Sequence, residues 1–398
     1  MFFPDNYEFW CPVKINSGNR ALEHLPVELD ALNARKPLIV TDKEIAKKGL
    51  IKKIAGAFKD SGITMGIFDG TPPVPDLKLV RRLMNNYRDT GCDSIIAAGG
   101  GAVVDMAKAL NVVVSGRPED LKEFAGEDLI KNPLGPFVFV PTASGTGFET
   151  SRFATLGELS FSSHFLMPDL VVIDPRMITS EKANTVVSTA MIALAHCAEA
   201  YTCPAKNPMT DTYAYVAMQF VGENLINVIK SGDKRGRLAL ANAATMAGIA
   251  FSNSPRGMVH ELGWTAGDIS GLPHGICMGI LLPYALEYNI NSEGYHMSDM
   301  LLPIAGPEIY AGTAENLKAR KAINFIYDMQ HDIHDITKGG IPLTLRDAGI
   351  SKDALKGIAD ATVRDGRTGF NMDDCMVILE HAWEGKPIKD GYRLPVHS

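Results

Sequence analysis

The chain has 398 residues, a formal net charge of −7 and 46% hydrophobic residues. This length and apolar content allow a large core and predict two domains. The basic residues are scattered, without interleaved aromatic residues, so we expect no nucleic-acid partner. No apolar run reaches the ~20 residues that span a bilayer, and the N-terminal stretch MFFPDNYEFW lacks the features of a signal peptide. We therefore expect a cytoplasmic protein without a membrane partner. Six dispersed cysteines favour reduced thiols over a disulfide framework.

Short β-rich runs alternate with helical patterns along the first half of the chain. The runs lie at 36–42, 65–70, 94–101, 136–142 and 169–175, and helical patterns occupy 44–62 and 76–91. This alternation is typical of a parallel sheet with helices on both faces. It predicts an α/β dinucleotide-binding domain, Rossmann-like in type, over residues 1–180.

The pattern changes after Asp174-Pro175 to long amphipathic helices, such as 214–230 and 236–252, with no convincing strand. We therefore expect an all-helical domain over residues 181–398 that carries the substrate and metal residues. In a chain of this type, the active site is expected in the cleft between the two domains.

A glycine-rich turn follows the third predicted strand, in SIIAAGGGAVVDMAKAL at 94–110. Gly99, Gly100 and Gly101 would let backbone amides approach a pyrophosphate, and the next helix would point its positive end there. The pattern is neither G-x-G-x-x-G nor a Walker loop, so a tight turn without a ligand is an equal alternative.

Two further strand ends carry candidate cofactor residues. Asp42 could accept hydrogen bonds from an adenosine ribose while repelling a 2′-phosphate, which favours NAD over NADP; the alternative is an ordinary helix N-cap. Thr142, Ser144 and Thr146 follow another strand, where hydroxyls and amides could hold the nicotinamide half or the phosphates, or cap a helix.

Three histidines in apolar surroundings suggest a metal site. His260 and His274 lie in the glycine-containing segment 251–283, and His196 interrupts an apolar, helix-compatible run at 184–202. Neutral imidazole is the commonest metal-ligating side chain. The ordinary alternative for any single histidine is a hydrogen-bonded core or surface residue.

Four motifs taken in order resemble the iron-dependent (group III) alcohol dehydrogenase family across nearly the whole chain. They are GGGAVVDMAKAL at 99–110, PTASGTGFE at 141–149, AHCAEAY at 195–201 and LPHGICMGILLP at 272–283. The resemblance implies a dehydroquinate synthase-like architecture and hydride transfer between NAD and a small alcohol or carbonyl substrate. It also implies a homo-oligomer, a dimer or larger, and a cofactor role for Asp105.

The resemblance further implies that His196, His260 and His274 hold Fe(II) or Zn(II), which polarises the substrate oxygen. Ile192 stands where the family has an aspartate ligand, one helical turn before the first histidine. Trp264 stands where many members carry a histidine assigned to proton relay. We expect His260, His274 and Trp264 to form the catalytic group, with Glu199 as either a substitute ligand or a structural residue.

Three alternatives remain open on the sequence. A metal-free carbonyl reductase on the same fold would polarise its substrate with hydrogen-bond donors. A lyase or cyclase of the dehydroquinate synthase type would show no net NADH production. A nucleotide-binding pseudoenzyme would bind NADH without turnover.

Overall fold

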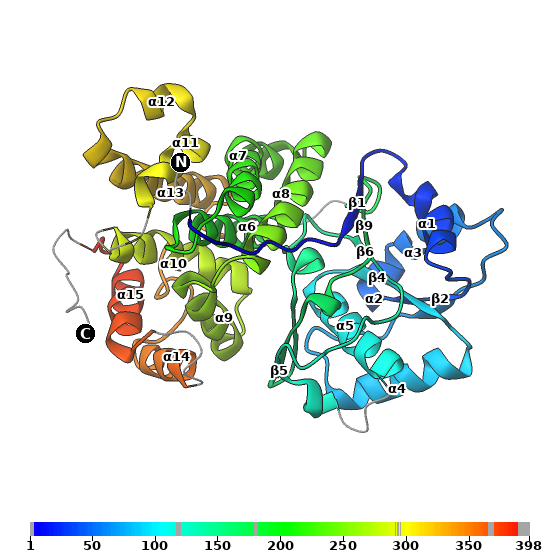
Figure 1. Ribbon diagram of the computed structural model, residues 1–398. Coiled ribbons are helices and arrows are strands. Elements are labelled where there is room, and N and C mark those ends of the chain that lie inside the picture. Colours follow the sequence, from blue (N-terminus) through cyan, green and yellow to red (C-terminus); the bar gives the residue numbers. More distant parts are fainter. Residues whose placement is uncertain are drawn as a thin grey trace. The chain divides into compact units, whose positions relative to one another are not determined.

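The computed structural model describes residues 4–116, 121–178, 182–290, 292, 294, 296–364 and 370–388. The chain divides into two compact units (Figure 1). Trp10–Glu181 is called the α/β unit, and Lys182–Ser398 with Met1–Phe9 is called the helical unit. Within the helical unit, Phe9 stacks on Tyr213 with ring centroids 5.8 Å apart, which ties the start of the chain to the helices.

A six-stranded parallel sheet forms the centre of the α/β unit (Figure 1). Every residue of its four inner strands is buried, as expected for parallel strands covered on both faces. The predicted parallel sheet is therefore confirmed. Its strands, in spatial order, are β1 (Lys14–Ser17), β9 (Leu170–Ile173), β6 (Phe137–Pro141), β4 (Ser94–Gly99), β2 (Pro37–Val40) and β3 (Gly66–Phe68).

Glycine and capping residues determine where helices of the α/β unit begin and end. The pattern at 44–62 forms two helices rather than one, because Gly49 adopts the left-handed conformation, with φ at 71°. Asp76 caps the next long helix by accepting a hydrogen bond from the Leu79 amide at 2.8 Å. The α-helices are α1 (Leu25–Ala31), α2 (Lys43–Lys47), α3 (Leu50–Ala57), α4 (Leu77–Asp89) and α5 (Gly101–Gly116), and the 3-10 helices are η1 (Ala21–His24), η2 (Leu121–Phe124), η3 (Phe148–Thr150) and η4 (His164–Leu166).

The strand order creates a switch point between β2 and β4. From β2 the chain moves to β3 on one side, then crosses to β4 on the other side before continuing to β6 and β9. Open parallel sheets bind ligands outside the carboxyl ends of their strands at such a point. The residues that follow these two strands, Thr41-Asp42 and Gly99–101, lie there.

A small second sheet was not predicted. It consists of β5 (Gly126–Glu127), β8 (Leu159–Ser162) and β7 (Phe153–Leu156). β7 and β8 form an antiparallel hairpin whose two-residue turn contains Gly157 at a φ of 59°. Glycine in this conformation is typical of tight hairpins. The strands have only two to four residues, too few for a clear alternating pattern.

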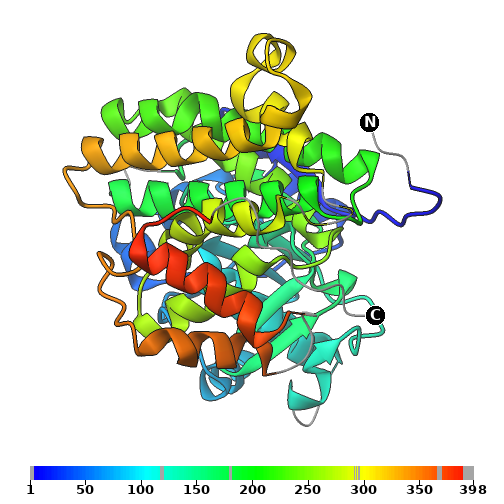
Figure 2. The same cartoon turned by 90° about the vertical axis from the view of Figure 1, so that its left-hand side faces the viewer.

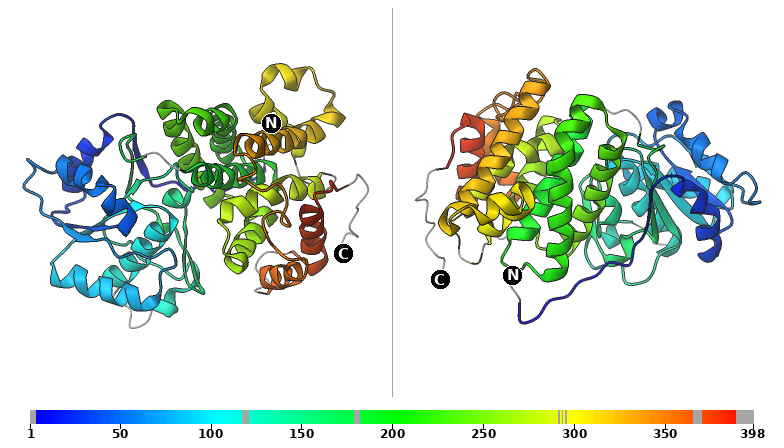
Figure 3. Two further views of the ribbon diagram at one scale, coloured as in Figure 1. Left: turned by 180° about the vertical axis from the view of Figure 1, so that it is seen from behind. Right: turned by 90° about the horizontal axis from the view of Figure 1, so that it is seen from above.

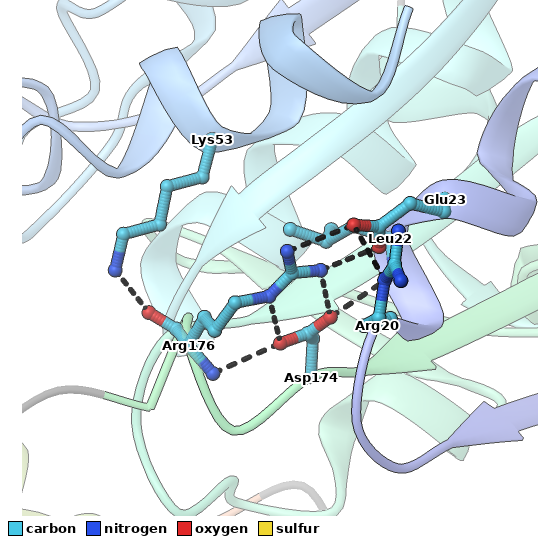
Figure 4. A network of polar contacts seen from close by, with 6 residues as sticks. All are labelled: Arg20, Leu22, Glu23, Lys53, Asp174 and Arg176. Carbon is cyan, nitrogen blue, oxygen red and sulfur yellow. Dashed lines mark hydrogen bonds and ion pairs between the residues drawn. The ribbon is translucent and has the colours of Figure 1, made fainter.

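A polar network secures the carboxyl end of β9 (Figure 4). The buried Asp174 carboxylate accepts hydrogen bonds from the Leu22 amide at 3.1 Å and from the Arg176 guanidinium at 2.6 and 2.9 Å. Arg176 also donates to both oxygens of Glu23, and its carbonyl accepts from Lys53. The network joins β9 to η1 and α3, so this strand-end carboxylate is structural.

The helical unit has no strand among its described residues, which confirms the predicted helical second half (Figure 2). α6 is buried along almost its whole length and contacts α7, α8 and α10, and α7 and α8 run side by side (Figure 3). None of the described helices has the length and apolar content needed to cross a bilayer. The helices are α6 (Ala183–Thr202), α7 (Pro208–Ser231), α8 (Lys234–Ser252), α9 (Met258–Ser270), α10 (His274–Asn289), η5 (Met297–Met300), α11 (Leu301–Ala305), α12 (Pro307–Ala311), α13 (Glu315–Ile336), α14 (Ala354–Val363) and α15 (Met372–Glu384).

Two glycines allow α10 to approach α6 closely. A Cβ at Gly275 would overlap the carbonyl of Ser188, and a Cβ at Gly279 would lie 3.2 Å from the Met191 side chain. The glycines are four residues apart and therefore share one face of α10. This contact fixes the start of α10, where His274 is the first residue.

Candidate active site

The glycine turn after β4 has open space above it. A Cβ at Gly99 would lie 2.5 Å from the Val103 side chain, so this position requires glycine for the entry into α5. A Cβ at Gly100 or Gly101 would meet no atom within 4 Å. The sixteen residues of α5 place the positive end of a helix dipole at this turn. The turn therefore has the space and the polarity that a diphosphate requires.

Asp42 follows β2 on the other side of the switch point. Its Oδ1 accepts a hydrogen bond from the Ile45 amide at 2.9 Å, so it is the N-cap of α2. Its neighbour Thr41 donates to the Ala98 carbonyl at 2.7 Å and joins the ends of β2 and β4. The capping role is thus present, and contact with a ribose stays a prediction.

The loop after β6 brings hydroxyl groups beside the glycine turn. The Thr142 amide donates to the Gly99 carbonyl at 3.3 Å, and Thr142 and Ser144 are both buried. Two glycines with φ near 85°, Gly145 and Gly147, stand on either side of Thr146. Gly147 is the N-cap of η3, which has no side-chain cap, so none of these hydroxyls caps η3.

Asp105 has surroundings that the sequence did not indicate. It is buried within α5, accepts a hydrogen bond from the Thr155 backbone and lies beside the charge of Lys108. Burial raises the pKa of Asp105 and lowers that of Lys108, and each charge opposes the shift of the other. Lys108 donates to the carbonyls of Phe148, Ser151 and Phe153 at 2.7–2.8 Å. The pair anchors the loop after β6, and direct contact of Asp105 with a cofactor stays a prediction.

Two of the three predicted metal-ligating histidines meet in the helical unit. His196 Nε2 on α6 lies 3.0 Å from His260 Nδ1 on α9, and both side chains are buried. Burial lowers the pKa of His196 to about 3 and moves the pKa of His260 well below its ordinary value, so both imidazoles are neutral at neutral pH. Phe251 stacks on the His196 ring with centroids 3.9 Å apart.

His274 makes other contacts. Its ring stacks on Trp264 with centroids 3.9 Å apart and planes 4° apart, and its Nε2 lies 2.8 Å from an Asp268 oxygen. Trp264 also lies beside His260, at 5.7 Å between centroids. The sequence analysis did not identify Asp268 as a partner of His274, which it precedes by six residues. The two are brought together by the turn at Gly271, whose φ is 73°.

The donor set of the histidine cluster does not fit a divalent metal. Across the residues that the structure describes, no three histidine, cysteine or carboxylate side chains are placed to hold an ion. A catalytic zinc needs three protein ligands, whereas here two imidazoles hydrogen-bond each other. Ile192, one turn before His196, is buried and offers no donor atom.

Glu199 has a structural role in placing His260. Its carboxylate accepts hydrogen bonds from the amides of Val259 at 2.6 Å and His260 at 3.3 Å, at the start of α9. A Cβ at Gly257 would overlap this carboxylate, so glycine there makes room for it. Burial raises the pKa of Glu199 to about 8, and the two amide hydrogen bonds oppose this shift.

A cavity of about 280 Å³ within the helical unit adjoins Glu199 and Val259. Its wall is largely apolar, and Arg256, one of the described wall residues, forms an ion pair with Glu261 at 3.2 Å. Other residues of the wall are Cys203, Met258, Leu286 and Phe370. This is the described cavity that borders the residues beside His260, so it is a candidate place for a small substrate.

Comparison with known proteins identifies two matching family models. Residues 12–175 match the model described as iron-containing alcohol dehydrogenase. Residues 186–377 match the model of the C-terminal part of the Fe-containing alcohol dehydrogenase family.

Individual relatives match over nearly their whole length. The 1,3-propanediol dehydrogenase of Klebsiella pneumoniae is 31% identical over 363 residues, covering 89% of this chain and 92% of that protein. The NAD-dependent methanol dehydrogenase of Bacillus methanolicus is 27% identical over 373 residues, covering 91% and 95%. A solved structure of a 1,3-propanediol oxidoreductase has a TM-score of 0.88 and 29% identity, covering 95% of this chain and 100% of that one.

Proposed function

Because the chain belongs to the iron-containing alcohol dehydrogenase family, we propose that it transfers a hydride between a nicotinamide cofactor and a small alcohol or its aldehyde or ketone. One observation supports this most directly. The open glycine turn after β4, Asp42 after β2 and the hydroxyl loop after β6 meet at the switch point of the parallel sheet. A dinucleotide requires these features together.

We propose NAD rather than NADP as the cofactor. Gly99–101 and the start of α5 would hold the diphosphate, and Thr142, Ser144 and Thr146 would contact the phosphates or the nicotinamide half. Asp42 would accept hydrogen bonds from the adenosine ribose, and its negative charge disfavours a 2′-phosphate.

The site's own groups can supply the proton that accompanies hydride transfer. Reduction of a carbonyl consumes NADH and one proton and gives NAD and the alcohol. A neutral imidazole carries one N–H. If His196 donates across the 3.0 Å contact, the proton of His260 is on Nε2; if His260 donates, the proton of His196 is on Nδ1. We propose that His260 hydrogen-bonds the substrate oxygen. The proton that leaves His260 Nε2 is replaced across the 3.0 Å contact by the proton of His196, and His196 Nδ1 takes up one proton from solvent, so the pair ends the reaction neutral.

The sequence predicts that His196, His260 and His274 hold a divalent metal, which would act as a Lewis acid on that oxygen. In the structure the first two hydrogen-bond each other, and His274 stacks on Trp264 and contacts Asp268. We therefore assign no step of the proposed reaction to a metal.

The test is net turnover of the cofactor. The purified chain is given NADH with small aldehydes and ketones, or NAD with the matching alcohols, and NADH absorbance is followed. Net conversion of cofactor and substrate in equal amounts is expected; NADH binding without turnover across the panel would contradict the proposal. The matched variant is Gly100→Ala, whose added Cβ meets no protein atom within 4 Å but intrudes on the proposed phosphate position. It should melt like the parent protein and bind NADH at least ~10-fold more weakly.

A further inference from the structure

We propose that the histidine cluster of this chain does not retain a divalent metal ion, because His196 and His260 hydrogen-bond each other, His274 is engaged by Trp264 and Asp268, and Ile192 supplies no donor. The inference concerns how the proposed substrate's oxygen is held, so it rests on the proposed function. The test is independent of the proposed function, because metal retention is measured without substrate or turnover.

Two contacts keep His274 in its position, and a glycine makes room for its ring. Its ring lies flat on Trp264, with planes 4° apart, and its Nε2 is 2.8 Å from Asp268. Gly267 provides the space, since a Cβ there would lie 2.5 Å from Cδ2 of the His274 ring. Moving His274 toward His260 would break the stack and the hydrogen bond together. Such stacked pairs and hydrogen bonds contribute measurable stability when formed.

The remaining pair is a poor metal site. The nitrogens that face each other, His196 Nε2 and His260 Nδ1, share a proton across 3.0 Å, and the nitrogen that donates has no lone pair for an ion. A metal would therefore have to displace this hydrogen bond. It would receive at most two neutral nitrogen donors in return.

Charge also opposes an ion at this place. Ile192 lies one turn before His196, on the same side of α6, and is buried among apolar residues. The Glu199 carboxylate is directed to the amides at the start of α9. A dication here would lack the anionic partner that a buried charge requires.

The experiment measures metal per chain after anaerobic reconstitution with Co(II) or Zn(II) and desalting. The parent protein should retain fewer than ~0.1 ions per chain, and the double variant Ile192→Asp/Trp264→His should retain about one, with the visible absorption of Co(II) bound to nitrogen and oxygen donors. The control pair Ile192→Leu/Trp264→Phe, which keeps the apolar contact and an aromatic stack, should stay empty. NADH affinity of each variant shows whether the α/β unit is still folded.

The parent protein alone can overturn the inference. Retention of about one ion per chain, lost in His274→Ala, would show that the three histidines do converge on a metal. If the parent stays empty, the inference stands, and turnover in the presence of a chelator then tests the proposed function separately. An empty protein without turnover would contradict the proposed function alone, and a loaded, active protein would contradict the inference alone.

Discussion

Asp42 combines a structural contact with a charge that we expect to select the cofactor. One carboxylate oxygen caps α2, so replacement by alanine would remove both the cap and the charge. Asparagine is an equally good N-cap residue and keeps the accepting oxygen. The two contributions of this residue can therefore be separated by one substitution.

We expect Asp42→Asn to leave the melting temperature unchanged and to narrow the preference for NADH over NADPH by ~10-fold or more, because the charge that repels a 2′-phosphate is lost. Dissociation constants for both cofactors, measured by quenching of protein fluorescence, test this. Equal discrimination in parent and variant would remove Asp42 from the cofactor site.

Glu199 shows how one buried carboxyl can place a neighbouring functional residue. The pKa of this group rises from its ordinary value of 4.5 to about 8 because of burial. Between these two values the folded protein keeps a proton that the unfolded chain has released. The free energy of unfolding contributed by Glu199 must therefore fall as the pH rises through this window.

Relative to Glu199→Gln, the parent protein should lose up to ~1.4 kcal/mol of stability per pH unit between pH 4.5 and 8. Glutamine stays neutral at every pH but can accept from only one of the two amides, so at the acid end this variant should be less stable than the parent by ~1–3 kcal/mol. Urea unfolding at several pH values measures the difference, and parallel curves for the two proteins would contradict the shift. Glu199→Ala leaves both amides without their acceptor and should cost ~2 kcal/mol at the acid end, and this cost should shrink as the pH rises.

At the scale of elements, the contact between α6 and α10 depends on an absent side chain. Gly275 faces the Ser188 carbonyl on α6, and backbone cannot move aside as a flexible side chain can. This contact sets where α10 begins, and with it the position of His274. The PHG motif therefore has a packing function in addition to its histidine.

Gly275→Ala should destabilise the protein by ~3 kcal/mol, because the two helices must separate to admit one methyl group. The matched control is Gly357→Ala in α14, where the added Cβ meets no atom within 4 Å; helix propensity should make it neutral or more stable by up to ~1 kcal/mol. Denaturant unfolding of the two variants compares them, and equal stability would show that α6 and α10 can readily adjust.

At the scale of the whole molecule, the family suggests two ligands, a dinucleotide and a divalent metal. We expect the first to raise the stability of the folded protein and the second to have no effect. The α/β unit presents the open glycine turn and the switch point of the sheet, where we propose that a dinucleotide binds. The histidine cluster, within the part of the chain that the structure describes, lacks three donors for a metal. A ligand that binds only the folded state raises stability, and one that does not bind has no effect.

EDTA treatment should leave the melting temperature of the whole protein unchanged, and added Zn(II) should not raise it. NADH at 100 times its dissociation constant should stabilise the protein by ~2.7 kcal/mol. Scanning calorimetry of one preparation under these conditions measures all three effects. A fall in melting temperature with EDTA, reversed by Zn(II), would reveal a metal that contributes to the fold.

The sequence by itself determined the fold class, the family and the location of the glycine turn between β4 and α5. The parallel sheet can be predicted because buried parallel strands are continuous apolar runs. The helical half can be predicted because its apolar residues recur with helical spacing. The glycine turn is readable because it joins a strand to a helix within one short segment. All of these are local patterns.

Only the tertiary structure decided which side chains meet. The sequence gives equal weight, as metal ligands, to His196, His260 and His274. In the structure the first two hydrogen-bond each other. The third stacks on Trp264 and contacts Asp268. Glu199 could be read as a ligand until its amide partners on α9 were seen. Contacts of this kind join residues on different helices or across a turn. They depend on helix packing and ring orientation, for which the spacing of residues along the chain contains no signal.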